Sequence, residues 1–304
     1  MLYWLAGFAL ALPFAGLAYQ WLGRRRDRRR YPPPGRIAAG LHLLETGSGS
    51  PPIILEAGMA ASSVSWRLVQ EPLSRDHTVI SYDRAGFSWS PEASTPRTIP
   101  NLVDDLKRLI DNSGVDGPFV LVGHSFGGLL LRHFTARYPR LVRGLVLVDP
   151  LDPCEWATVS EKQRHMLDLG IRLARRAGVL ARFGCVRLGL DLLLAGGRCV
   201  PRLVARLGAG HGGGGAADRL VGEVRKLPQD LWPAVCSHWC LPGRFRTMAE
   251  YLERLPEFCA EPVDNSALSA IPVIIVSASK NKPEVIEAHR RTAAGSTRGR
   301  HVVA

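Results

Sequence analysis

The feature that most constrains this chain is a short pattern of strand, glycine-rich turn and helix. The apolar run 118–122 leads into Gly123-His124-Ser125-Phe126-Gly127, and residues 129–138 then have the apolar content of a helix. In a G-x-S-x-G turn this tight, the positions two before and two after the serine must be nearly free of side chain. The serine takes a strained backbone conformation that lifts its hydroxyl above the sheet edge. The pattern therefore predicts that Ser125 is a nucleophile.

Two backbone N–H groups are predicted to face the place where an oxyanion would form beside Ser125. One belongs to Phe126, at the start of the helix. The other belongs to Met59, which follows the apolar run 52–56 and the glycine turn at Gly58. Backbone N–H groups aimed at developing negative charge stabilise the intermediates of acyl transfer. An ordinary turn between strand and helix is the alternative role for the segment around Met59.

Four segments occur together at intervals typical of one fold family. They are Glu56-Ala57-Gly58-Met59, Asp83-Arg84-Ala85-Gly86-Phe87-Ser88, Gly123-His124-Ser125-Phe126-Gly127-Gly128 and Leu147-Val148-Asp149-Pro150. As a set they resemble the α/β-hydrolase fold family, in its esterase, peptidase and perhydrolase-like branch, from about residue 38 to the end. The resemblance implies an α/β fold in which helices flank a sheet.

The same resemblance implies acyl chemistry, because dehalogenase and epoxide-hydrolase members carry aspartate where this chain has Ser125. The chain departs from the family pattern at two places. It has Ala57 where the family has histidine before the glycine of the oxyanion turn, and Ser88 where the family has glycine. We expect Asp83 and Arg84 to brace their loop, not to act in catalysis.

A serine triad in this fold runs in the order serine, acid, histidine along the chain. The predicted strand 144–148 ends at Asp149, and the next, 272–276, is followed by no carboxylate before Glu284. We therefore predict that Asp149 is the acid, with Asp152 and Glu284 as alternatives. A buried turn that braces the chain is the other role open to Asp149.

No histidine occupies the place of the triad base, which in the family lies in a loop after the last strand. Residues 300–304 have the pattern of that strand, and His301 at its start lies roughly 10 Å short of the active edge at about 3.3 Å per residue. His124 is constrained by the turn, and His289 belongs to the preceding helix. The remaining candidates, His165, His211 and His238, lie in an insertion. Either the sequence is truncated before its histidine, or the protein is a degenerate hydrolase that binds without turnover.

Residues 1–23 contain no charged side chain and are followed by the arginine cluster 24–30. An apolar helix of about 21 residues, rising about 1.5 Å per residue, matches a hydrocarbon core of about 30 Å. We predict a single-pass membrane anchor over 1–23 and a cytoplasmic hydrolase domain, because positive charge resists translocation. A cleaved signal peptide is the alternative, since Gly16-Leu17-Ala18 resembles a cleavage site.

The predicted organisation after the anchor is a basic and proline-rich linker over 24–37 and a hydrolase core in two parts. These parts, 38–152 and 269–304, are separated by a helical cap over 153–268, which would exclude water from the nucleophile. A packing role alone is the alternative for most of the apolar residues in that insertion. The glycine run around His211 lacks the lysine of a phosphate loop, so nucleotide binding is not predicted.

Composition limits the partners of the chain. Hydrophobic residues make up 46% and charged residues 22%, which is typical of a globular protein. The net charge is +12, but no basic stripe interleaved with aromatic residues occurs, so nucleic acid is not an expected partner. The cysteines lack the spacing of a metal site. We therefore predict a hydrolase of small acyl substrates at a lipid bilayer, without metal or organic cofactor, or alternatively a non-catalytic binding or scaffolding module.

Overall fold

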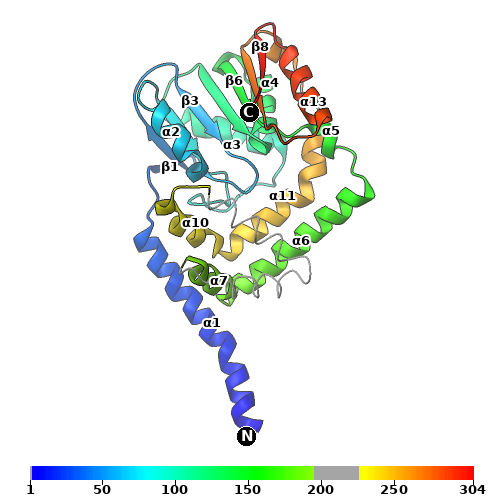
Figure 1. Cartoon of the computed structure of the whole chain (residues 1–304). Coiled ribbons are helices and arrows are strands. Elements are labelled where there is room, and N and C mark those ends of the chain that lie inside the picture. Colours follow the sequence, from blue (N-terminus) through cyan, green and yellow to red (C-terminus); the bar gives the residue numbers. More distant parts are fainter. Residues whose placement is uncertain (1, 195–225) are drawn as a thin grey trace. The chain divides into compact units, whose positions relative to one another are not determined.

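The computed structural model describes residues 2–194 and 226–304, with side chains from residue 11 onward except at 193. The chain divides into two compact units. The helical unit comprises residues 1–33 and 165–252, and the sheet unit comprises residues 34–164 and 253–304. The segment at the N-terminus is thus grouped with the middle of the chain, although more than a hundred residues separate them (Figure 1).

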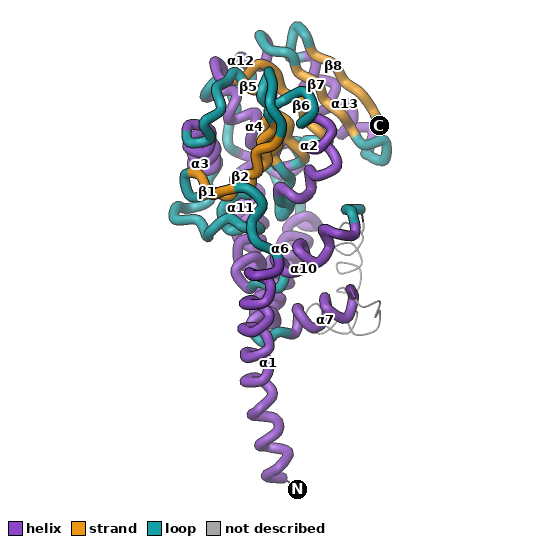
Figure 2. The backbone as a smooth tube through the Cα atoms, turned by 90° about the vertical axis from the view of Figure 1, so that its left-hand side faces the viewer, coloured by secondary structure: helices purple, strands orange, loops and turns teal. Residues whose placement is uncertain are grey.

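The sheet unit is built on one eight-stranded sheet in the order β1-β2-β4-β3-β5-β6-β7-β8. Strand β2 pairs antiparallel with β1 and with β4, whereas every pair from β4 to β8 is parallel. Figure 2 shows these strands in orange with helices beside them. The strands are β1 (Arg36–Ala38), β2 (Leu41–Thr46), β3 (Ile53–Glu56), β4 (Val79–Tyr82), β5 (Phe119–His124), β6 (Val142–Val148), β7 (Val273–Ser277) and β8 (Gly299–Val303).

The central strands are apolar runs because a parallel sheet covered by helices is buried on both faces. In β3, Ile53, Ile54 and Leu55 are all buried, and the next strand β4 is buried throughout. The helices that flank the sheet include α2 (Arg67–Leu73), α3 (Ile99–Asp111), α4 (Phe126–Arg137), α12 (Ser266–Ser269) and α13 (Pro283–Ala294). The short elements η1 (Ser63–Trp66), η2 (Pro139–Leu141) and α5 (Pro153–Trp156) connect them.

The predicted α/β sheet is confirmed. Each apolar run proposed as a strand coincides with one of the strands β3 to β8 to within a few residues. Because β3, β5, β6 and β7 run parallel, their carboxyl ends lie at one edge of the sheet. Met59, Ser125 and Asp149 follow β3, β5 and β6, so the topology places all three after neighbouring strand ends.

The helical unit contains most of α6 (Glu161–Arg182), α7 (Cys185–Leu194), η4 (Gln229–Leu231), α10 (Trp232–Trp239) and the first part of α11 (Pro242–Ala260). It also contains α1 (Leu2–Arg30). Helices α6 and α7 fall where helical periodicity predicts them. The glycine run around His211 lies outside the described residues.

The N-terminal segment differs from its prediction. Helix α1 continues to Arg30, so residues 24–30 are helical instead of forming a linker. Arginine favours helices, and positive charge near a helix C-terminus interacts favourably with the helix dipole. The transmembrane helix predicted over 1–23 is not found. Over the part of the chain whose side chains the structure describes, no helix is both long and apolar enough to cross a membrane.

The contacts of α1 give a physical reason for this difference. The helix packs on α7 and α10 with a stripe of small and polar residues, Gly16, Gln20, Gly23 and Asp27. Arg187 of α7 donates to Gln20 Oε1 at 2.9 Å and to Asp27 Oδ2 at 2.6 Å. The carboxyl half of α1 therefore packs against protein.

Replacing Asp27 tests how firmly α1 is held. Arg187 is 1% exposed at its side chain, so Asp27→Ala would leave a buried charge without its carboxylate. Loss of one partner of a buried ion pair destabilises by about 3–5 kcal/mol. We expect faster tryptic cleavage within the arginine cluster 24–30 of Asp27→Ala. The double variant Asp27→Leu with Arg187→Met, which removes both charges, should be cleaved more slowly than the single variant. Equal cleavage of all forms would contradict the prediction.

Candidate active site

The turn between β5 and α4 has the geometry of a nucleophile elbow. Ser125 has φ 50° and ψ −119°, outside the conformations that non-glycine residues usually adopt. A Cβ atom on Gly123 would lie 2.8 Å from the carbonyl carbon of Gly127. A side chain at Gly123 would collide with Gly127, and one at Gly127 would collide with the backbone oxygens of Glu56 and Ala57, which is why the pattern needs glycine at both positions. Ser125 is partly exposed, as a reacting hydroxyl must be.

The loop after β3 lies directly beside the elbow. A Cβ atom on Gly58 would lie 3.5 Å from Ser125 Cβ and 2.8 Å from His124 Nδ1. Phe126 is the first residue of α4, in the turn whose N–H groups have no acceptor within the helix. The structure thus places Gly58, the residue before Met59, and the first turn of α4 next to Ser125.

Asp149 follows β6 at the same sheet edge. His124 pairs with Val148 in the β5–β6 register, and Ser125 N donates to Val148 O at 3.0 Å. Asp149 has φ 45°, and its Oδ1 accepts from Ala278 N at 3.3 Å and from Asn281 Nδ2 at 2.5 Å. Within the described residues, its Oδ2 has no hydrogen-bond partner. One oxygen is thus held by the loop after β7, and the other remains to orient a second group.

The two alternative acids have other roles or positions. Asp152 caps α5, its Oδ1 accepting from Cys154 N at 3.0 Å. Glu284 lies exposed in the first turn of α13, where a carboxylate interacts favourably with the helix dipole. Asp149 is therefore the carboxylate whose position and partners best suit the role of the triad acid.

No histidine of the described chain hydrogen-bonds to Ser125 or Asp149. His124 follows the course of the elbow and is exposed. His165 and His238 belong to the helical unit. His211 lies outside the described residues.

Two histidines instead share a serine just below the sheet edge, a cluster that the sequence did not reveal. Ser277 Oγ lies 2.7 Å from His289 Nδ1 and 2.8 Å from His301 Nε2, and His289 Nε2 lies 2.8 Å from Pro150 O. A carbonyl only accepts, so His289 Nε2 carries the proton, Ser277 donates to His289 Nδ1, and His301 Nε2 donates to Ser277. Burial, followed by the neighbouring His289, lowers the pKa of His301. The cluster ties β7, β8 and α13 to the residue after Asp149.

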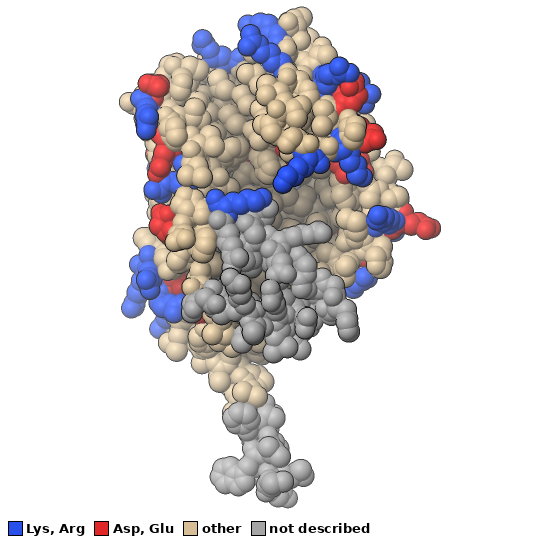
Figure 3. Space-filling view, in the orientation of Figure 1, with Lys and Arg blue, Asp and Glu red and all other residues tan. Residues whose placement is uncertain are grey.

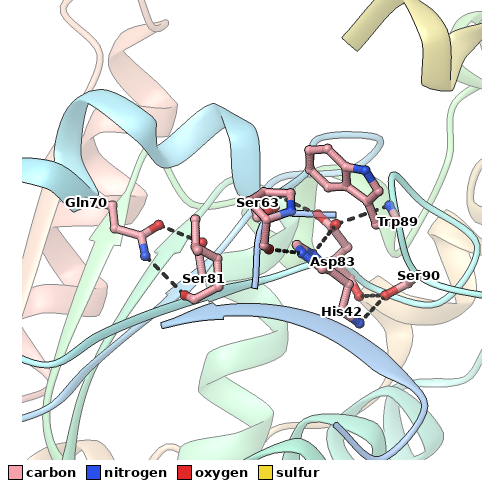
Figure 4. Close-up of polar contacts among 9 residues, drawn as sticks. His42, Ser63, Gln70, Ser81, Asp83, Trp89 and Ser90 are labelled. Atoms are coloured by element: carbon pink, nitrogen blue, oxygen red, sulfur yellow. Dashed lines mark hydrogen bonds and ion pairs between the residues drawn. The ribbon is translucent and has the colours of Figure 1, made fainter. Parts of the chain in front are cut away.

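A second network braces the loop after β4, as expected for Asp83. Its carboxylate accepts from Ser63 N and lies 2.8 Å from His42 Nδ1, and both side chains are fully buried. Ser90 Oγ accepts from His42 N at 2.8 Å and donates to Asp83 O at 2.5 Å. Figure 4 shows Asp83 at the centre of this group, between His42 and the backbones of Ser63 and Trp89. The carboxylate is fully used in holding the loop.

Arg84, the next residue, braces a different segment. Its guanidinium donates to Glu56 Oε1, to Ala57 O at 2.6 Å and to Gly58 O at 2.5 Å. Tyr82 donates its hydroxyl to the second oxygen of Glu56. Burial raises the pKa of Glu56 to about 7, although Arg84 opposes that shift. These contacts lie behind the loop that carries Gly58 and Met59.

Charge on the surface is mixed. On the face seen in Figure 3, arginine and lysine side chains are interspersed with acidic ones. Some oppositely charged side chains pair within a helix. Lys107 pairs with Asp111 in α3, and Arg290 pairs with Glu287 in α13. Such exposed pairs contribute little to stability.

Comparison with known proteins places this geometry in a family. Residues 51–180 match the sequence profile of the alpha/beta hydrolase fold. Over these residues the chain resembles the α/β-hydrolase family, and its sheet and helices have the α/β-hydrolase fold. This profile covers β3 to β6, and so includes the elbow, the loop after β3 and Asp149.

Curated relatives match part of the chain. An AB hydrolase superfamily protein of Gibberella zeae is 39% identical over 97 residues, 32% of this chain and 30% of that protein. Lipase LipV of Mycobacterium tuberculosis is 36% identical over 128 residues, 42% of this chain and 48% of the lipase. The chain therefore spans less than half the length of these relatives.

Among solved structures, a thermophilic esterase from Thermogutta terrifontis aligns with a TM-score of 0.52 and 21% identity. The alignment covers 87% of this chain and 84% of the esterase. At this identity the likeness shows the fold alone. The fold and the hydrolase names of the relatives support a hydrolase.

The raised pKa of Glu56 predicts a specific pH dependence of stability. The pKa rises from an ordinary 4.5 to about 7 in the folded protein, so the folded state binds the proton more tightly. The stability that Glu56 contributes is then fully present below pH 4.5 and is lost as pH rises through about 7. We expect the difference in melting temperature between the native protein and Glu56→Gln to change steadily over that window, in favour of the variant at higher pH. A constant difference would contradict the prediction.

Proposed function

We propose that this protein is a serine hydrolase that cleaves an ester or amide through an acyl-Ser125 intermediate. Ser125 Oγ attacks the carbonyl carbon, and its proton passes to the departing alcohol or amine. Water then hydrolyses the acyl-serine and releases the acid. The Met59 and Phe126 N–H groups hold the oxyanion. Asp149 is the acid that would orient a histidine base. A small acyl compound is the proposed substrate.

The observation that carries this proposal is the position of Gly58 against Ser125 in a strained elbow. The two segments that would supply oxyanion donors, the loop after β3 and the first turn of α4, both adjoin Ser125, which supports a role in stabilising a tetrahedral intermediate. The carboxylate of Asp149 at the neighbouring strand end, with one oxygen held by Asn281, adds support. One of the relatives is named a lipase, and a lipase agrees in reaction class with this proposal.

A second candidate function follows from the histidines. Because no histidine of the described chain contacts Ser125 or Asp149, the fold could serve as a binding or scaffolding module with little turnover. Loss of a triad member leaves only the oxyanion and binding contributions to rate. Such a protein would bind an acyl compound without forming a covalent bond to it.

A fluorophosphonate probe separates the two functions. Ser125 Oγ would attack phosphorus with loss of fluoride, so we expect covalent labelling of the native chain at Ser125. Ser125→Ala should abolish labelling, and Ser269→Ala, which changes an exposed serine of α12 outside the elbow, should retain it. Labelling is measured by mass spectrometry of the modified peptide. An unlabelled native protein with an intact fold would reject the hydrolase and favour the binding module.

We further propose that α1 holds the protein to an anionic membrane, with the hydrolase domain in the cytoplasm. The helix presents small and polar residues to the protein and apolar residues to its surroundings, which is the reverse of an ordinary helix in a soluble protein. Its small and polar stripe packs on α7 and α10, whereas Phe14 is 71% exposed and Leu12 is 55% exposed. Arg25 stacks 3.7 Å from the Trp21 ring, at the boundary between this apolar surface and the arginines of 24–30. Such a boundary suits a lipid interface.

Flotation with lipid vesicles tests the role of this surface. We expect the native protein to float with vesicles that contain phosphatidylserine, and less with phosphatidylcholine alone, because arginines attract anionic headgroups. The triple variant Leu12→Glu, Phe14→Glu, Leu17→Glu should remain in the bottom fraction, without the vesicles. A matched control, Leu68→Glu with Val69→Glu on exposed α2, should float normally. Flotation of the α1 variant, or self-association of the native protein that vesicles do not disperse, would overturn the proposal.

A further inference from the structure

The guanidinium of Arg84 touches both sides of the predicted oxyanion site from behind. It donates to the carbonyl oxygens of Ala57 and Gly58, and its Cζ lies 5.3 Å from the centroid of the Phe126 ring. Arg84 is only 4% exposed, so it is buried beneath the loop and away from solvent. Glu56 accepts from the Arg84 guanidinium and from the Tyr82 hydroxyl, and so holds the guanidinium in place.

The two carbonyls belong to the peptide groups that carry the N–H of Gly58 and the N–H of Met59. In a trans peptide the C=O and the N–H point in opposite directions. The cis bonds of the described chain are Ser50-Pro51 and Gly117-Pro118, so both of these peptide groups are trans. A donor that fixes the direction of Gly58 O therefore also fixes the direction of Met59 N–H, away from Arg84.

Gly58 also lies against the nucleophile elbow, since a Cβ atom there would be 3.5 Å from Ser125 Cβ and 2.8 Å from His124 Nδ1. Gly58 O has one other donor, Ala61 N at 3.2 Å, which closes a tight turn. That bond is long, and it does not restrain Ala57 O. The charged bonds from Arg84 are shorter and thus the stronger restraint on both peptide planes.

We propose that Arg84 is a positioning residue, which aims the Met59 N–H at the oxyanion by holding the Ala57 and Gly58 carbonyls. It touches neither substrate nor reacting atoms, and acts only through the two peptide planes. This role rests on the proposed serine hydrolase function. It assigns to Arg84 a part in the chemical step, beyond bracing the loop after β3.

The test compares three forms of the full chain. Glu56→Gln keeps both carbonyl bonds from Arg84 but removes the buried carboxylate. Glu56→Gln with Arg84→Met removes the carbonyl bonds without leaving that carboxylate unpaired. For each form, fluorophosphonate labelling of Ser125 gives a maximal rate and a half-saturating concentration. Thermal unfolding shows which forms are folded, and Arg84→Lys in the same background replaces the methionine form if that form does not fold.

We expect the double variant to lose maximal labelling rate with little change in half-saturation, because probe binding does not need the oxyanion. The maximal rate should fall at least about tenfold. The fall should not exceed the loss of about 10²–10³-fold that follows removal of an oxyanion donor. Glu56→Gln alone should label at close to the native rate. Equal rates for a folded double variant and Glu56→Gln would overturn the proposal. An unlabelled native protein would instead reject the serine hydrolase function itself, and this role with it.

A second readout does not depend on activity. The chain has four methionines, and Met1 at the amino terminus has no amide N–H, so selective ¹⁵N-methionine labelling gives a small set of resonances. The loss of one resonance in Met59→Leu assigns Met59. We expect this resonance to shift or broaden in the double variant and to stay in place in Glu56→Gln. An unmoved Met59 amide in the double variant would overturn the role of Arg84.

Discussion

The contact between Gly127 and the backbone of residues 56 and 57 is the constraint on which the candidate site depends. A Cβ atom at Gly127 would lie 2.6 Å from Glu56 O and 2.7 Å from Ala57 O, so helix α4 and the loop after β3 meet at backbone distance. This approach places Ser125 beside Gly58 and lets the first turn of α4 face the same point. A side chain at position 127 would separate the nucleophile from one of its two predicted oxyanion donors.

Local constraints of this kind can be predicted from sequence. The elbow requires glycine at two fixed positions, and the apolar runs around it are short, buried strands of a parallel sheet, so residues 52–56, 118–122 and 144–148 were enough to order β3, β5 and β6. The position of Asp149 at that edge follows from the same rule, because the carboxyl ends of parallel strands share one edge. Its predicted role as the acid depended in addition on the order of triad residues in the family that the chain resembles.

Long-range polar contacts could not be predicted in the same way. Arg84 reaches back to carbonyls 26 and 27 residues earlier, and Ser277 joins two histidines on separate elements. Neither partner set has a spacing signature. The reading of α1 failed for a related reason. Mean hydropathy over 1–23 describes how apolar the segment is, whereas the decisive fact is that Gln20 and Asp27 form one stripe that Arg187 binds. Two polar residues at helical spacing were the available signal.

The site is held in place from behind by buried polar groups that do not themselves face it. Arg84 restrains the loop before Met59, Asn281 and Ala278 restrain Asp149, and the cluster around Ser277 restrains Pro150. Preorganisation of this kind stabilises developing charge without reorganisation at the moment of reaction. Within the described chain, packing and backbone anchoring hold the elbow and the residues around it in place. The reactivity of Ser125 is therefore the property that distinguishes an enzyme from a binding module.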